Sequence, residues 1–162
     1  MFEFELEREK HIWLATWIDT EGNITLQKRD GSQYHNKSFW LPWMYITNTS
    51  LPVIVELQAV TGATMRTRKR AGTNWNDKYE LYISPNKCRE LLPSIRPFLV
   101  IKQRHADLML EALALLRDNL RHSGGSGEAR VENHEVVDRN FARLGEIHQE
   151  LAALNRRGNL GE

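Results

Sequence analysis

The sequence of 162 residues has one cysteine, Cys88, and no apolar run near the roughly 20 residues that cross a bilayer. A lone cysteine excludes an intramolecular disulfide, so we expect an intracellular, reducing compartment: cytoplasm, nucleoid or a eukaryotic organelle. The opening stretch MFEFELEREK alternates glutamate with apolar residues, so we expect no signal peptide there. No histidine stands at zinc-site spacing from Cys88, and no glycine-rich phosphate loop occurs. These absences argue against a secreted disulfide scaffold, a membrane protein and a P-loop enzyme.

Net charge is also nearly absent, at +1, but its distribution is uneven. Residues 1–22 hold six acidic and two basic residues, whereas residues 23–84 hold eight basic and four acidic ones. Residues 85–122 are basic as well, with seven against four. A basic middle favours a polyanionic partner such as nucleic acid, although a solvated surface of mixed sign would give the same counts.

Residues 7–20 predict a helix that is apolar on more than one face, which one small domain can rarely bury. A second copy of the chain could supply the other side. This helix ends in LATWIDTEG, with Asp19 and Glu21 just before Gly22. A helix C-terminus already carries partial negative charge and unpaired carbonyls, so carboxylates have the wrong sign there. Either they are incidental and solvated, or a cation binds between them.

Beyond Gly22 the apolar period changes to two, which predicts strands over residues 23–29 and 38–48 around an Asp-Gly turn. Pro42 predicts an edge or a bulge in the second strand. A short helix from Ser50 to Gly62 follows, and the strand, turn, strand plan repeats up to residue 84. Residues 85–95 and 97–120 predict two further helices. We therefore expect an α+β fold in the order α-β-β-α-β-β-α.

The chain divides by composition into three parts. Residues 1–122 form the expected main domain, residues 123–133 (SGGSGEARVEN) predict a flexible linker, and residues 134–162 form a C-terminal helical extension. Apolar residues at steps of three and four carry that last helix to about Leu154. It either packs against its own domain or is a separate element that binds a partner.

The nonapeptide of residues 14–22 resembles the signature of the LAGLIDADG homing endonucleases, matching at six positions if Glu21 is accepted for aspartate. The resemblance extends over residues 7–120, through the order of elements and the segment PFLVIKQRHADL. It implies that family's fold, in which the antiparallel sheet forms a DNA-binding saddle, here followed by a C-terminal helix. It also implies a site-specific DNA endonuclease. Because residues 23–162 hold no second signature, it implies a homodimer paired through the signature helices.

The resemblance assigns roles to single residues. It implies that the Glu21 carboxylate and the Thr20 carbonyl bind Mg²⁺ or Mn²⁺, and that Asp19 holds the helix ends together. Lys102 corresponds to the active-site lysine, and Asn48 to a polar residue that orients solvent. A further basic residue of some relatives has no counterpart after Asn48; the two candidates to replace it are Arg104 and the C-terminal segment. The expected dimer interface is Ile12, Trp13, Thr16, Trp17, Asp19 and Thr20.

The polar faces of the strands are the expected DNA-binding surface. Asn and Gln side chains suit adenine edges and Arg suits guanine, whereas lysines more plausibly neutralise phosphates. Any one-sided sheet shows such a face to water, so the surface is not diagnostic on its own. The expected DNA-binding residues are Asn23, Thr25, Gln27, Lys28, Arg29, Gln33, Tyr34, Lys37, Tyr45, Arg66, Arg68, Lys69, Arg70, Lys78 and Glu80. Trp43 shares the phase of Tyr45, and one of these two aromatics could instead pack beneath the long helix.

Two other functions stay open at this stage. The same fold could serve a catalytically silent DNA- or RNA-binding protein, such as a maturase acting on its own intron RNA or a regulator. An unrelated α+β scaffold that binds a protein through its last helix is the third possibility, and it would have no affinity for DNA.

Overall fold

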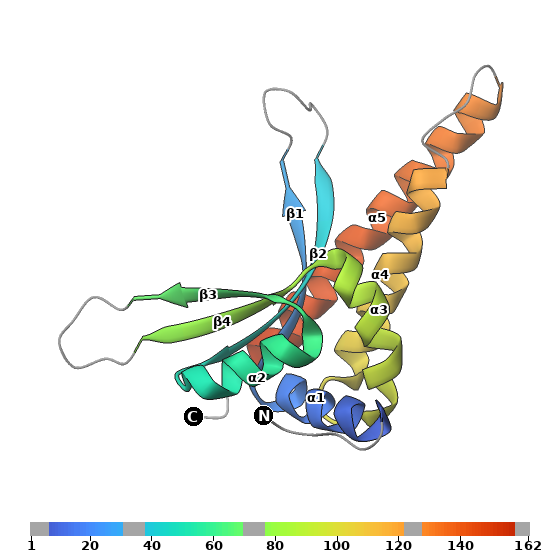
Figure 1. Ribbon diagram of the computed structural model, residues 1–162. Helices are drawn as coiled ribbons and strands as arrows, with labels where there is room; N and C mark the ends of the chain where they lie inside the picture. Colours follow the sequence, from blue (N-terminus) through green and yellow to red (C-terminus); the bar gives the residue numbers. More distant parts are fainter. Residues whose placement is uncertain (1–6, 31–37, 70–76, 122–127, 158–162) are drawn as a thin grey trace. The chain divides into compact units, whose positions relative to one another are not determined.

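Alternation of apolar and polar residues sets the two faces of each strand, and burial follows it residue by residue. The computed structural model describes residues 7–30, 38–69, 77–121 and 128–157, without the side chains of residues 121 and 128–132 (Figure 1). Buried Trp40, Pro42, Met44 and Ile46 alternate along one strand with side chains of the opposite face. The period of two that predicts this strand is therefore confirmed.

The elements follow in the expected order. They are α1 (Glu7–Glu21), β1 (Gly22–Arg29), β2 (Phe39–Asn48), α2 (Leu51–Thr61), β3 (Thr64–Arg68), β4 (Lys78–Ile83), α3 (Pro85–Ile95), the 3-10 turn η1 (Arg96–Phe98), α4 (Gln103–Arg121) and α5 (Glu128–Arg157). The α+β class and the α-β-β-α-β-β-α order, with a C-terminal helix, are confirmed. Among the described residues, no helix is both long and apolar enough to span a membrane.

The four strands lie in the order β1-β2-β4-β3. Strand β2 pairs antiparallel with β4 from Met44 opposite Ile83 to Asn48 opposite Tyr79. Strand β3 pairs with the other side of β4, also antiparallel. The edge position predicted from Pro42 is wrong, because β2 is an inner strand. Pro42 nevertheless precedes the β2–β4 ladder, which begins at Met44. Its missing N–H therefore costs that ladder no hydrogen bond.

The chain forms two compact units, and β1 and β2 pass from one to the other. The first unit, residues 1–24 and 43–106, holds α1, α2, α3, β3 and β4. Its core contains Ile18, Ile46, Leu57, Leu81 and Leu92, none more than 1% exposed. Cys88 is buried in this core, where its thiol donates to the Ile83 carbonyl at 3.4 Å. Burial raises the pKa of Cys88 to about 12.

The second unit, residues 25–42 and 107–162, is built on the pair of helices α4 and α5, which lie side by side (Figure 1). Arg143 of α5 binds Glu111 of α4 through two hydrogen bonds of 2.6 and 3.0 Å. The Trp40 ring of β2 packs against Phe141 and His148 of α5, at 5.6 and 5.4 Å between ring centroids. Helix α5 thus packs within its own chain, as one of the two expected alternatives has it.

Two expected boundaries are wrong. The helix expected over residues 97–120 begins only at Gln103, because residues 99–102 turn their backbone toward Asp19 and Leu99 is extended. The linker expected over residues 123–133 is helical from Glu128, where α5 begins. Glycines and serines predict the break in the chain, but they end before residue 128.

Candidate active site

The Asp19 carboxylate caps the start of α4. It accepts the backbone N–H groups of Val100, Ile101 and Lys102, at 2.6, 3.2 and 2.8 Å. These groups precede the first helical turn, which the Ala106 N–H closes on the Lys102 carbonyl at 2.9 Å. Orphan donors at a helix N-terminus need an acceptor, and an anion suits the dipole there. Asp19 is only 8% exposed, so this acidic residue has a role in holding its own chain.

Lys102 also contacts Asp19 through its side chain. Its ammonium donates to the main-chain carbonyl of Asp19, at the last turn of α1. The Lys102 side chain is half-buried, and burial lowers its pKa, while the carboxylates of Asp19 and Glu21 act in the opposite direction. The structure therefore brings Lys102 close to both acids of the nonapeptide. A cation at the C-terminus of α1 also has the sign that the helix dipole favours.

Glu21 is the last residue of α1, and its side chain is exposed. Strand β1 starts at the very next residue, Gly22. A Cβ on Gly22 would lie 2.6 Å from the Ile18 carbonyl oxygen and 2.7 Å from the Ile18 Cα, so no larger residue fits this passage unchanged. Glycine at position 22 lets the chain pass close to the Ile18 backbone directly after the helix. This passage fixes the backbone position of Glu21. The Thr20 carbonyl lies in the same final turn.

The face of α1 opposite to its core contacts carries the expected interface residues. Leu14, Ala15 and Ile18 are buried on the side that packs against α3 and η1. The other side has exposed Ile12, Thr16 and Thr20 at steps of four.

Both threonine hydroxyls on this face donate to carbonyls four residues earlier, at 3.0 and 2.9 Å, so their polar groups are satisfied within α1. Trp13 and Trp17 meet edge to face beside this row, at 6.2 Å. The result is a largely apolar exposed face. Of the six expected interface residues, Asp19 alone is buried and turned toward its own chain.

Asn48 ends β2, and its side-chain oxygen accepts the Ser50 N–H at 2.8 Å. This bond shapes the turn into α2, whose N-cap Ser50 makes no side-chain capping bond of its own. Asn48 therefore has a local structural role at its oxygen. The expected role of orienting solvent would fall to its amide nitrogen.

In the first unit, the polar sheet face joins several expected DNA-binding residues. Arg68 forms an ion pair with Glu80, with 2.8 Å between Nε and Oε2, and the Arg66 guanidinium lies over the Tyr82 ring at 4.5 Å from its centroid. Tyr45 packs against the same ring, at 6.3 Å. Trp43 does so too, at 5.8 Å, so both aromatics of β2 lie on this face. Lys78 of β4 is half-buried opposite Arg68.

In the second unit, Thr25, Gln27 and Arg29 alternate with the buried positions of β1, and Arg29 donates to the Gln27 side chain at 3.2 Å. Lys28 has the other phase: its ammonium lies 5.8 Å from the centre of the Phe141 ring of α5. Lys28 is thus on the helix side of the strand, away from the polar face. Asn23 belongs to the first unit; it has the same phase in β1 as Thr25, and its side-chain oxygen is buried.

The remaining expected residues need only placing. Lys69 is exposed just after β3. Gln33, Tyr34, Lys37 and Arg70 lie outside the described residues.

Three residues of interest are missing from the sequence-based prediction. Tyr82 stands two residues after Glu80 in β4, and that spacing alone would have placed it on the polar face. Val100 and Ile101 are 84% and 69% exposed, although their apolar run suggests a buried helix. Their exposure follows from the turn that Asp19 imposes.

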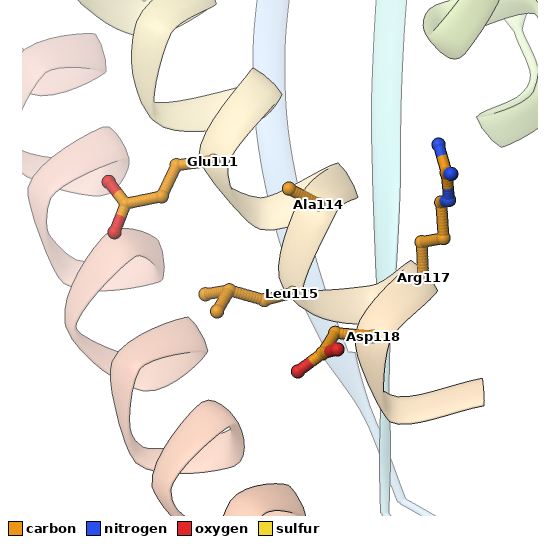
Figure 2. A pocket seen from close by; sticks show the side chains of 5 residues that line it. All are labelled: Glu111, Ala114, Leu115, Arg117 and Asp118. Carbon is orange, nitrogen blue, oxygen red and sulfur yellow. The ribbon is translucent and has the colours of Figure 1, made fainter. Parts of the chain in front are cut away.

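One further hollow lies along α4, an open groove of about 420 Å³ (Figure 2). Its lining residues are Glu111, Ala114, Leu115, Arg117 and Asp118. Its acids are already engaged: Glu111 binds Arg143, and Asp118 accepts the Asn140 side chain at 3.0 Å. The groove is therefore part of the α4–α5 contact and not a second candidate site.

Solved structures of homing endonucleases match nearly the whole chain. The I-CvuI homing endonuclease, in complex with its target in the presence of calcium, is 20% identical with a TM-score of 0.60, over 92% of this chain and 96% of its own. The archaeal intron-encoded I-Vdi141I, complexed with DNA, is 14% identical with a TM-score of 0.55, over 93% and 99%. I-TnaI, another homing endonuclease, is 18% identical with a TM-score of 0.56, over 89% and 99%.

A further match, I-CpaMI, is a LAGLIDADG meganuclease bound to uncleaved DNA, with a TM-score of 0.58 at 16% identity; it covers 85% of this chain and 49% of its own. This chain has the LAGLIDADG homing endonuclease fold. The resemblance predicted from residues 14–22 is thus confirmed at the level of the fold. No protein-family model and no curated protein matches the chain.

Proposed function

We propose that the protein is a site-specific DNA endonuclease that acts as a homodimer and hydrolyses both strands with a divalent metal. The observation that carries the proposal is the exposed Glu21 at the end of α1, within electrostatic reach of Lys102, in a chain with the LAGLIDADG fold. The neighbours named above include complexes with DNA, which supports double-stranded DNA as the partner.

The residues at the end of α1 fit a hard divalent cation, but only in part. Glu21 offers an exposed carboxylate and Thr20 a backbone carbonyl, both oxygen donors of the kind that Mg²⁺ takes. Within the described residues of one chain, no group of three or more acidic, histidine or cysteine side chains could hold a metal ion. We therefore propose that two copies of Glu21 and a DNA phosphate complete the site. A metal bound there would activate water and stabilise the leaving oxygen.

The other residues act through position and charge. Lys102, held at the Asp19 carbonyl, has a positive charge that interacts with Glu21, and we propose that it stabilises the charge that develops on a phosphate during hydrolysis. The amide nitrogen of Asn48 is proposed to orient solvent. Asp19 is proposed to act only through the backbone of residues 100–102, by fixing where Lys102 begins α4.

The homodimer is supported by the exposed apolar face of α1. Ile12 is 41% exposed there, and the satisfied threonines beside it would cost little to desolvate. The same unit also exposes Val100 and Ile101, next to the end of α1 through the Asp19 contact. Burial of these apolar side chains between two copies would stabilise the dimer.

Sedimentation of two matched variants tests the dimer. The unaltered protein should have twice the 18.9 kDa mass of one chain. Thr16→Lys puts a charge in the middle of the α1 face and should reduce the mass to that of one chain. Gln149→Lys adds the same charge at an exposed position of α5 and should leave the dimer intact. A monomeric unaltered protein would contradict the proposal.

Cleavage of DNA from the sequence flanking this reading frame tests the activity. A plasmid that carries the uninterrupted flanking sequence should be cut on both strands when magnesium is present and left intact with EDTA. Binding without any cutting would instead favour the catalytically silent DNA- or RNA-binding protein. No binding at low salt would overturn both.

A further inference from the structure

Tyr82 is the centre of a four-residue arrangement on the polar sheet face. Its hydroxyl donates to Glu80 Oε2 at 2.8 Å and accepts from Arg68 Nη2 at 3.3 Å. Its ring lies under the Arg66 guanidinium, 4.5 Å from centroid to Cζ. One side chain thus orients two arginines, the first through its ring and the second through its oxygen.

The pairing register of β3 and β4 shows how the side chains of this arrangement meet. Arg66 lies opposite Glu80, and Arg68 lies opposite Lys78. Yet Arg68 reaches diagonally to Glu80, and Arg66 reaches diagonally to Tyr82. Both arginines therefore lean the same way along β4. Diagonal neighbours on a sheet are close enough for such long side chains to meet.

The two charged partners of the Arg68–Glu80 ion pair differ in burial. The Glu80 side chain is only 8% exposed, whereas the Arg68 side chain is 66% exposed. A buried carboxylate is expensive unless it is paired, so Glu80 needs the Arg68 guanidinium and the Tyr82 hydroxyl. These contacts also raise the pKa of Arg68, the hydrogen bond to Tyr82 more than the charge of Glu80. Trp43 and Tyr45 brace the Tyr82 ring from β2.

The contacts leave hydrogen-bond donors for a ligand. An arginine has five N–H donors in one plane, and stacking on a ring uses none of them. Arg68 uses its Nε N–H for Glu80 and one Nη2 N–H for Tyr82, so these contacts leave its other three N–H donors for a ligand. A planar fork held in one orientation matches the O6 and N7 acceptors of guanine in the major groove.

We propose that Tyr82, supported by Glu80, is a positioning residue that holds Arg66 and Arg68 ready to read two guanines in the DNA major groove. This inference rests on the proposed function, because it needs duplex DNA on the polar sheet face. It adds a specific claim: base preference at two positions depends on a tyrosine that itself touches no base. An ordinary structural ion pair would stabilise the sheet without affecting base preference.

Selection of bound duplexes from a random-sequence pool, without magnesium so that DNA stays uncut, tests the proposal. The unaltered protein should enrich two guanine positions in each half-site. Arg68→Ala should abolish the preference at one of them and Arg66→Ala at the other. Each bidentate arginine–guanine contact discriminates by about 5- to 160-fold.

The Tyr82 variants then separate ring from hydroxyl. Tyr82→Phe keeps the ring under Arg66 but removes the hydroxyl, so it should weaken the Arg68 position about tenfold and spare the Arg66 position. Tyr82→Leu removes both and should weaken both positions. Tyr79→Phe is the matched control, since Tyr79 has the opposite phase in β4 and should change neither. Lys69→Ala should lower affinity for all sequences alike, as loss of a phosphate contact does.

The outcomes are distinguishable. If Tyr82→Phe lowers thermal stability but leaves the selected sequences unchanged, the arrangement is only structural and the inference is overturned. The same holds if Arg66→Ala and Arg68→Ala weaken binding without changing preference at any position. If the unaltered protein enriches no duplex at all, the proposed function itself fails, which is a different result.

Discussion

The Asp19 carboxylate accepts the Lys102 backbone N–H at 2.8 Å, while the Lys102 ammonium donates to the Asp19 carbonyl. This reciprocal contact joins the end of α1 to the start of α4 across 83 positions of sequence. It explains why the apolar helix α1 ends in two acidic residues: Asp19 caps the start of α4, and Glu21 is left exposed. The candidate active site depends on this joint.

Replacing Asp19 tests the joint. Asp19→Ala should lower the free energy of unfolding by about 2–4 kcal/mol, because three backbone donors lose a charged acceptor. Asp19→Asn retains one acceptor oxygen and should cost about half as much. Urea denaturation followed by circular dichroism measures both. Equal stability of all three proteins would mean that the cap contributes nothing.

Gly22→Ala should both destabilise the protein and disturb its site. The new Cβ would meet backbone atoms of Ile18, which cannot rotate away, so a cost of about 2 kcal/mol is expected. Gly62→Ala is the control, since Gly62 has φ +59° and should cost about 1 kcal/mol far from the chemistry. DNA cleavage should fall with the first change and not with the second. A fully active Gly22→Ala protein would contradict the proposed geometry.

Gly145→Ala should stabilise the protein by about 1 kcal/mol. Glycine inside a helix is unfavourable by that amount, and a Cβ at Gly145 would lie at an ordinary 3.9 Å from the Trp40 ring. Thermal unfolding measures the change. A lower melting temperature would mean that Trp40 and α5 lie closer together than described.

Stability should fall at alkaline pH on account of Cys88. Burial raises its pKa from 9.0 to about 12, so between these values the unfolded chain loses the thiol proton and the folded chain keeps it. From pH 8 to pH 10, the unfolding free energy should fall by about 1.4 kcal/mol more in the unaltered protein than in Cys88→Ala. Urea titrations of both proteins at both pH values give the difference. Parallel losses would show that the thiol is not buried in this way.

Much of the fold could be predicted because its signals are local. The phase of Ile24 and Leu26, and the cap residues Ser50 and Gly62, each lie within a few residues of what they determine. The start of α4 could not be predicted in this way. Its cap, Asp19, comes from 81 to 83 positions earlier, and nothing near Gln103 indicates it.

The candidate site likewise has parts that the sequence predicts and parts that depend on long-range contacts. Glu21 and Lys102 follow from the resemblance, and their proximity needs the fold. The network of Arg66, Arg68, Glu80 and Tyr82 depends on diagonal reach between strands, which alternation does not reveal. Lys28 was expected among the DNA-binding residues, but its strand phase places it toward α5. Counting positions from Leu26 would have shown this.

Magnesium-dependent cleavage by Glu21→Gln tests the central claim most directly. The substitution preserves the shape of the side chain but removes the charge and one of the two oxygens that we propose bind the metal. In the absence of magnesium, we expect the variant to bind the target duplex as tightly as the unaltered protein does. When magnesium is added, we expect it to cut neither strand. Cleavage at an undiminished rate would contradict the account.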